Sequence, residues 1–451
     1  MHNKPVLNAN ACRYLVIAVL LPGLPTAVMA DESRVERYAD GAKKYLYSVD
    51  VDGKRHGDFN AFYPDGMRKG QARYVHGKLF GPIKGYHASG RIKLRATYRE
   101  GLRTGKCQEF AEDGSPTKTS NYRDGKLHGA VQQFDGGRVV KDEIWLDGRL
   151  LIPRSPALIS AELAAIAKMP VETVGDVPQV SAAIQAALRD PVKHRQREAA
   201  LRVLMSYRFL CGVPYRDLAL DHNYNAAAEA TVQILSRLGR LTHTPENPGL
   251  PPTDYEFARD GAASCNIYRG GSMVGSVKCY MDDSDPTNIE RLGHRRWCLN
   301  PAMQKTGFSG AKQFAAMWSM DGSRAKVPDY EFVAFPPPGL IPTSTFGSRY
   351  AWSVSLNPAK YEPPTLKAVG VQIWPAQLDL RAGTMQKAPQ ALKLDYFGVS
   401  ETNHGIGNCI IFRPEDVNIS ANTGYWVEIT GLKDTHGKAA KIEYFAGFFR
   451  L

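Results

Sequence analysis

Two histidines, a cysteine and an aspartate in the second half of the chain have side chains that bind metals or transfer protons. They are His243, His294, Cys265 and Asp283. Imidazole, thiolate and carboxylate groups are all usual ligands of zinc, so this set is chemically able to bind the ion. Two further roles are open to Cys265: a nucleophile, if a histidine generates its thiolate, or one half of a disulfide with Cys279. The spacing alone does not establish which residues meet.

Helices are predicted to precede and position these residues. From residue 150 to about 191, Ala-rich stretches separated by prolines predict a helical linker. Helical periodicity then indicates one helix over about 194–210 and another over about 223–238. Asp221 is the expected N-cap of the second helix, because its side chain can accept from first-turn amides, and Gly239 suits the left-handed position after the helix.

Several short segments follow the second helix in a fixed order. They are Leu241-Thr242-His243, Ser264-Cys265-Asn266-Ile267, Val277-Lys278-Cys279-Tyr280-Met281-Asp282-Asp283, Gly293-His294-Arg295-Arg296-Trp297-Cys298-Leu299-Asn300-Pro301 and Gly307-Phe308-Ser309-Gly310. This order resembles the bacterial form of the CAP superfamily (cysteine-rich secretory, antigen 5 and pathogenesis-related proteins, with an SCP domain). The resemblance implies an α-β-α sandwich, here residues 192–335. It also implies a large cleft lined by two histidines and acidic residues, in which some members bind metal, often zinc.

The resemblance can be carried over position by position. His243 and His294 match the paired cleft histidines of the family, and they are therefore the implied ligands of zinc. Cys265 stands where the family has its first glutamate, and Asp283 falls where bacterial members have serine and others glutamate. We expect the guanidinium of Arg295 to pair with a carboxylate. No residue is assigned as catalytic, and the implied cleft residues are His243, Cys265, Asn266, Asp283, His294 and Arg295.

The region before the linker is an internal repeat with a period of 24 residues, beginning at Gly53 and ending near Gly148. Turn-forming triplets such as Pro64-Asp65-Gly66 predict β-hairpins that stack into an elongated array over residues 31–149. The segments Gly77-Lys78-Leu79-Phe80-Gly81 and Gly125-Lys126-Leu127-His128-Gly129 resemble the MORN-type repeats of bacterial proteins. That resemblance implies a module for binding or spacing. Its frequent Lys and Arg residues either attract an anionic surface or form an ordinary solvated strand face.

After the helical region, from about residue 336, apolar residues alternate with period two, as in Val369, Val371 and Ile373. Short strands between turn signals predict an antiparallel β-sandwich over residues 336–451, in which no cluster looks catalytic. The expected fold class is thus an α+β multidomain chain. Its parts are a β-hairpin repeat array, a helical linker (150–191), a CAP-like α-β-α sandwich and a C-terminal antiparallel β-sandwich.

Residues 1–30 have the pattern of a signal peptide. Lys4 and Arg13 precede an apolar run, and Val28-Met29-Ala30 is a small-x-small cleavage signal. Cleavage after Ala30 predicts a periplasmic or secreted protein in which disulfides can form, Cys265 with Cys279 being the expected pair. No apolar run reaches the ~20 residues of a membrane-spanning helix, so no transmembrane segment is expected after cleavage. The formal charge of +12 favours anionic surroundings, but no recognised motif predicts nucleic-acid binding.

These observations give three hypotheses of function. In the first, an exported, non-enzymatic envelope or secreted protein binds an envelope lipid, glycan or peptide in a CAP-like cleft, and the repeat array serves adhesion or spacing. In the second, zinc on His243 and His294 polarises a carbonyl and activates water for a hydrolase, with Asp283 as general base. In the third, the chain is an interaction scaffold with an inactive cleft.

Overall fold

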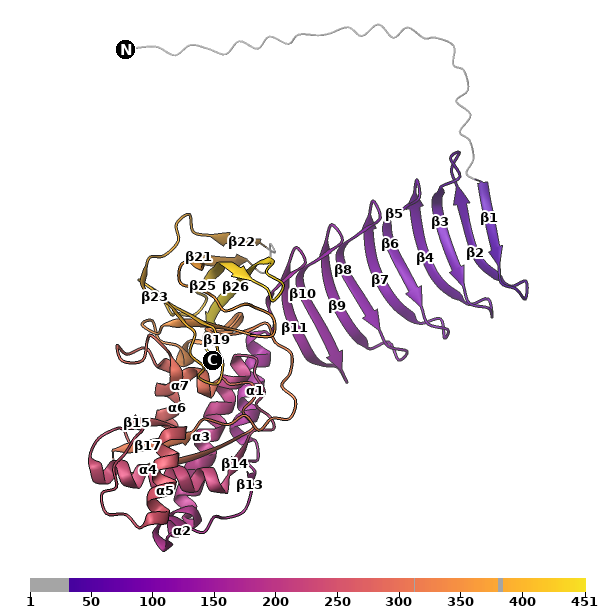
Figure 1. Cartoon of the computed structure of the whole chain (residues 1–451). Helices are drawn as coiled ribbons and strands as arrows, with labels where there is room; N and C mark the ends of the chain where they lie inside the picture. The colour runs from indigo at the N-terminus through magenta and orange to yellow at the C-terminus, as the bar shows by residue number, and fades with distance from the viewer. Residues whose placement is uncertain (1–31, 312, 380–383) are drawn as a thin grey trace, which may run out of the picture.

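A computed structural model describes residues 32–311, 313–379 and 384–451 (Figure 1). The predicted export signal, residues 1–30, lies outside the described residues. None of the helices in these ranges combines the length and the apolar character of a membrane span.

The N-terminal third is one twelve-stranded sheet in which each strand pairs antiparallel with its neighbour along the chain, except that short β5 branches off β4 (Figure 1). The strands are β1 (Glu32–Arg37), β2 (Lys43–Val49), β3 (Arg55–Phe62), β4 (Arg68–Val75), β5 (Lys78–Leu79), β6 (Gly81–Tyr86), β7 (Ile92–Arg99), β8 (Leu102–Phe110), β9 (Pro116–Arg123), β10 (Lys126–Asp135), β11 (Arg138–Leu146) and β12 (Arg149–Ile152). The sheet extends away from the rest of the molecule as a row of hairpins.

Positive backbone φ angles explain the glycine columns of the repeat. In the turn after β4, His76 and Gly77 have φ of 44° and 82°, and the same pair of signs recurs one repeat later at Glu100 and Gly101, with φ of 51° and 84°. A tight hairpin turn of this kind needs positive φ at both central residues, and glycine adopts it without steric cost. Neighbouring hairpins are also joined by side chains: the Tyr63 hydroxyl donates to the Tyr86 carbonyl at 2.8 Å.

The middle region contains seven helices and a five-stranded sheet of order β13-β14-β16-β17-β15 in the described ranges. Its elements are α1 (Pro156–Lys168), β13 (Thr173–Val174), α2 (Ala182–Arg189), α3 (Pro191–Leu210), β14 (Ala219–Asp221), α4 (His222–Leu238), α5 (Pro252–Ser264), β15 (Cys265–Arg269), α6 (Met273–Asp282), α7 (Gly293–Cys298), β16 (Lys305–Ala311) and β17 (Phe314–Trp318). The predicted caps of α4 are confirmed. The Asp221 carboxylate accepts from the amides of Asn223 and Tyr224, and Gly239 has φ of 68°.

The C-terminal region consists of two sheets, ordered β18-β20-β24-β23 and β19-β26-β25-β21-β22. Its strands are β18 (Phe332–Phe335), β19 (Gly339–Pro342), β20 (Trp352–Leu356), β21 (Gly370–Asp379), β22 (Thr384–Lys387), β23 (Leu394–Ser400), β24 (Cys409–Pro414), β25 (Gly424–Lys433) and β26 (Ala439–Phe449). The sequence predicted a purely antiparallel region. That prediction is wrong at one position, because strand β19 pairs parallel with β26.

The predicted fold class is wrong. Strands make up 41% of the described residues and helices 22%, and the largest sheet among them is the twelve-stranded antiparallel one. The expectation of an α+β chain with an α-β-α sandwich gave too much weight to helical periodicity, which ends with α7 at residue 298. The middle sheet also mixes parallel and antiparallel pairs, and its strands β13 and β14 have only two and three residues. The chain is mostly β because its repeats and C-terminal sheets contribute most of its regular structure.

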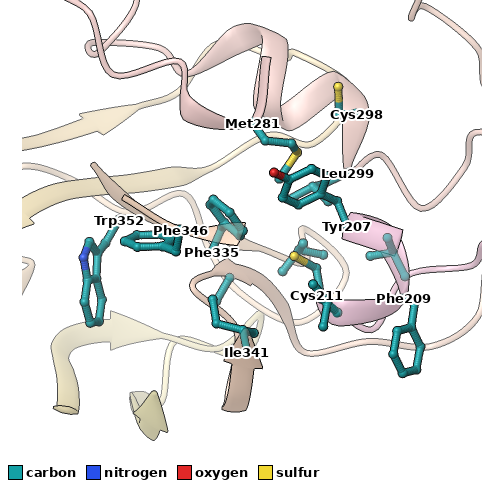
Figure 2. Packing of buried hydrophobic residues seen from close by; sticks show 14 of the residues in the cluster. Tyr207, Phe209, Cys211, Met281, Cys298, Leu299, Phe335, Ile341, Phe346 and Trp352 are labelled. Carbon is teal, nitrogen blue, oxygen red and sulfur yellow. The ribbon is translucent and has the colours of Figure 1, made fainter. Parts of the chain in front are cut away.

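A single hydrophobic core joins the middle helices to the C-terminal sheets (Figure 2). Tyr207 of α3 meets Phe335 of β18 with ring centroids 6.0 Å apart. Phe346 lies at the centre of this cluster, because its ring centroid is 5.0 Å from that of Phe335 and 5.9 Å from that of Trp352. The helices and the C-terminal sheets therefore stabilise each other through shared aromatic packing.

Replacing Phe346 with alanine should remove this central ring. Because Phe346 is only 5% exposed, we expect the Phe346→Ala substitution to lower the free energy of unfolding by about 3–5 kcal/mol, measured by urea denaturation. Leu366→Ala, at a side chain that is 56% exposed, is the control and should change it by less than about 0.5 kcal/mol. Equal effects of the two substitutions would contradict the shared core.

Candidate binding cleft

A cleft of about 720 Å³ lies between α6, α7 and β15. The loop that contains His243, before α5, and the loop that contains His404, before β24, also line it. Five of the six residues singled out from the sequence line it, the exception being Arg295; the five are His243, Cys265, Asn266, Asp283 and His294. Side chains from elements far apart in the chain therefore face one cavity. The two histidines reach it from the loop after α4 and from the first turn of α7.

Asp283 connects α6 to α7 and orients one of these histidines. It follows the last residue of α6 with a left-handed φ of 50°, and its amide donates to the Cys279 carbonyl at 3.0 Å. Its carboxylate Oδ1 lies 2.7 Å from Nδ1 of His294, while Oδ2 accepts from the backbone amides of His294 at 2.9 Å and Arg295 at 3.3 Å. The carboxylate accepts all three bonds, so Nδ1 of His294 carries a proton and Nε2 points away from the carboxylate.

His243 is held in the same way by a different acceptor. Its Nδ1 lies 2.6 Å from the carbonyl oxygen of Ala262, the third residue from the end of α5. A carbonyl can only accept, so Nδ1 of His243 carries a proton and donates it to this oxygen. In the described part of the chain, no hydrogen bond is made by Nε2 of His243 or of His294. The cleft therefore contains two imidazoles whose Nδ1 atoms are held by acceptors and whose Nε2 atoms have no partner within the described residues.

These residues do not fit a zinc site. Zinc takes three or four protein ligands, whose donor atoms must converge on one point. Within the described ranges, the one group of three potential ligand atoms lying within 4.8 Å of one another is in the repeat array and includes no cleft residue. The cleft thus offers two imidazoles without a third converging ligand, and no metal-dependent step follows from its geometry.

Cys265 is a buried thiol, and its disulfide with Cys279 is a wrong prediction. All six cysteines of the described chain are free, Cys265 being buried and Cys279 exposed. Cys265 packs at the start of β15 against the apolar face of α4, whereas Cys279 is an exposed residue of α6 that lines the cleft. Burial raises the pKa of the Cys265 thiol far above its ordinary value, which disfavours the thiolate that a nucleophilic role would need.

Asn266 and Arg295 position α7 rather than present groups to a ligand. The side-chain amide of Asn266 donates to the His294 carbonyl at 3.0 Å. Arg295 is fully buried outside the cleft, where it donates to the carbonyls of Met281 at 2.7 Å and Ala351 at 2.6 Å. Its predicted pairing with a carboxylate is therefore wrong. Consecutive helical residues point about 100° apart, so when His294 faces the cleft Arg295 faces the core.

Sequence reasoning missed a third histidine, His404, in the loop before β24. It lines the cleft beside the start of α7, where a Cβ at Gly293 would lie 3.2 Å from its Nδ1, and its Nε2 is buried without a hydrogen-bond partner. Burial, together with the guanidinium groups of Arg296 and Arg291, lowers the pKa of His404 to about 4. Gly405 packs against Trp297, since a Cβ there would lie 2.7 Å from the indole. The sequence signal that could have pointed to this loop was its pair of glycines, Gly405 and Gly407. Nothing in the sequence, however, showed that the loop packs against α7.

No family model and no curated protein matches this sequence. Among solved structures, an extracellular protein containing a SCP domain from Bacillus anthracis str. Ames is 12% identical, covers 64% of this chain and 89% of its own, and has a TM-score of 0.22. A cysteine-rich secretory protein from Staphylococcus aureus subsp. aureus Mu50 is 13% identical, covers 63% and 86%, and has a TM-score of 0.19. A chain of the GtfA/B complex is 11% identical, with 37% of this chain and 29% of that chain covered and a TM-score of 0.17. This chain spans less than half the length of the GtfA/B chains it matches, and TM-scores this low do not establish a common fold.

The lowered pKa of His404 predicts a pH dependence of stability. The unfolded chain binds a proton at the ordinary His pKa of 6.5 and the folded chain only near about 4, so stability falls as pH decreases across that window. We expect His404→Gln to flatten the decline of the urea midpoint between those pH values. His436→Gln, in the exposed turn between β25 and β26, should keep the wild-type slope. If the urea midpoint of His404→Gln declined with pH as steeply as that of the wild type, His404 would not be the group responsible for the pH dependence.

Proposed function

We propose that this chain is an exported, non-enzymatic binding protein of the envelope or the extracellular space, and that its cleft binds a glycan or a peptide. The observation that carries the proposal is the pair His243 and His294. Each has Nδ1 held by an acceptor and Nε2 free in one cavity. Neutral imidazoles fixed in this way accept hydrogen bonds from the hydroxyl or amide groups of a ligand.

The other cleft residues favour a polar ligand over a lipid. Carboxylate and amide side chains of Asp282, Asp285 and Asn288 line the cleft together with the aromatic rings of Tyr268 and Trp297. Sugars and peptides combine donors for such oxygens with apolar faces that pack on aromatic rings. Apart from the small Ala263, the aliphatic side chains that line the cleft are only those of Leu241, Ile267 and Met320. A glycan or peptide is therefore the better match among the three ligand classes expected for the cleft.

In this proposal the hairpin array acts as a spacer or an adhesion surface. It projects away from the part of the molecule that contains the cleft (Figure 1). Guanidinium groups lie over its aromatic rings, as Arg55 does over Tyr47 at 4.8 Å and Arg103 over Tyr122 at 5.4 Å. Attraction to an anionic surface and the MORN-type assignment of the array both stay predictions.

One observation favours a second function, hydrolysis without a metal. The buried carboxylate of Asp283 and the ring of His294 have the arrangement of an oriented general base, in which a carboxylate fixes the imidazole tautomer and Nε2 takes a proton from water. No protein nucleophile is bonded to that Nε2 in the described part of the chain, so water would be the attacking group. The hydrolase function requires that the protein convert a substrate into products, whereas the binding function requires only that it form a complex with a ligand.

Calorimetric titration of the full chain with soluble peptidoglycan fragments, which contain both sugar and peptide, tests the proposal. We expect His243→Ala and His294→Ala each to weaken binding about tenfold, the effect of losing one hydrogen bond in a desolvated site. His194→Ala, at a half-exposed side chain on α3, is the matched control and should bind as wild type. Equal affinity in all variants would refute the cleft as the binding site. Fragment cleavage that disappears in His294→Ala would favour the hydrolase instead.

Export has its own test. Mass spectrometry of the protein expressed in a bacterial host should find a mature chain that begins at Asp31 and lies outside the cytoplasm. Leu20→Arg places a charge in the apolar run and should leave the precursor uncleaved in the cytoplasm. A chain that retains Met1 to Ala30 in the wild type would contradict this part of the proposal.

A further inference from the structure

A second group of chemically active side chains lies in the repeat array, near the end that is distant from the cleft (Figure 1). Asp50 is in the turn between β2 and β3, His56 is in β3, and His76 is in the turn after β4. Each offers one potential ligand atom, and these atoms lie within 4.8 Å of one another. This is the one group of three such atoms in the described ranges, 32–311, 313–379 and 384–451.

The carboxylate of Asp50 is fixed by the backbone of its own turn. Its Oδ1 accepts from the amides of Asp52 at 3.1 Å and Lys54 at 2.9 Å. The other oxygen, Oδ2, lies 2.7 Å from Nδ1 of His76. The Asp50 side chain is only 8% exposed, so the carboxylate is oriented before any ion arrives. Hydrogen bonds of this kind to the oxygen not facing the metal are typical of protein metal sites.

The two imidazoles lie side by side, His56 on β3 and His76 in the turn after β4. The ring centroids of His56 and His76 are 4.7 Å apart, with an angle of 68° between the ring planes. The backbone at His76 is fixed by the tight turn, and its amide donates to Nδ1 of His56 at 3.4 Å. Because the His76 side chain is 66% exposed, the group is open to solvent on one side and an ion can enter.

The same positions in the other repeats lack this combination. Where His56 and His76 stand in the first unit, the second has Phe80 and Glu100 and the third has Thr104 and Asp124. The fourth unit has His128 and Asp147, whose contact is 3.1 Å. There, however, Arg123 binds both oxygens of Asp147, at 2.7 Å and 2.8 Å, and neutralises it. The position equivalent to Asp50 is tyrosine in each later unit, as in Tyr74.

We propose that Asp50, His56 and His76 form a binding site for a first-row transition-metal dication, with zinc as the probe. Two imidazoles and one carboxylate suit zinc, nickel or copper, whereas magnesium and calcium prefer oxygen ligands alone. On binding, the ion replaces the proton shared by His76 Nδ1 and Asp50 Oδ2, and that proton passes to solvent. Three protein ligands leave one tetrahedral position for water. The site is independent of the cleft and of its proposed function.

Equilibrium dialysis of the full chain against zinc, together with the visible absorption of its cobalt complex, tests the site. We expect stoichiometric binding and a tetrahedral cobalt spectrum in the wild type. His76→Ala and His56→Ala should each weaken zinc binding by about tenfold or more. Asp50→Asn keeps the turn's shape but reduces the charge on the ligand, and it should weaken binding as well.

The chain provides two matched controls. His128→Ala alters the equivalent histidine of the fourth unit, and it should bind zinc as wild type. A His243→Ala/His294→Ala double variant removes the cleft imidazoles and should also retain the site. Wild-type affinity in His76→Ala, or loss of binding in the double variant, would overturn the proposal. Circular dichroism should show that His76→Ala, at an exposed turn residue, has the same fold as the wild type.

Discussion

The cleft depends on one buried carboxylate. Asp283 ends α6 in a left-handed conformation and receives three donors from the start of α7, two of them backbone amides. This arrangement sets the distance between the two helices, the direction of the His294 ring and the nitrogen that carries its proton. A residue without two acceptor oxygens at this position could not satisfy both the amides and the imidazole. The chemistry of the cleft and the local fold therefore rest on the same side chain.

Two buried guanidinium groups extend this arrangement into the C-terminal sheets. Arg295 donates to the Ala351 carbonyl before β20, and Arg296 donates to the Ile406 carbonyl at 2.9 Å in the loop that contains His404. Burial lowers the pKa of both groups, and each recovers the cost of desolvation only by bonding several carbonyl and hydroxyl oxygens. The C-terminal region thus holds α7 in place and contributes His404 to the cleft, in addition to packing on the helices through Phe346.

The sequence allowed prediction of those features that depend on contacts between near neighbours. The caps Asp221 and Gly239 were predictable because a cap is satisfied within one turn of helix, and the glycine columns because each glycine serves its own hairpin. His243 and His294 were predicted as cleft residues from a family resemblance, because their spacing in the sequence does not indicate that they lie close together. His404 could not be predicted, because Arg296 and Ile406, which bring its loop to α7, are 110 residues apart. The fold class failed for a related reason, since helical periodicity is conspicuous but says nothing about how much of the chain is sheet.

The repeat array illustrates how a fixed backbone allows the chemistry to vary. The residue before the turn glycine has nearly the same φ in every unit, from 44° at His76 to 51° at Glu100, whatever its side chain. The hairpin is stabilised by the glycine and by pairing along the sheet, so this exposed position can change from imidazole to carboxylate at little cost in stability. What distinguishes the first unit is then the neighbourhood alone: His56 and Asp50 surround His76, whereas Arg123 neutralises Asp147 in the fourth. A stacked array can in this way place a reactive group in one unit without altering the fold of the others.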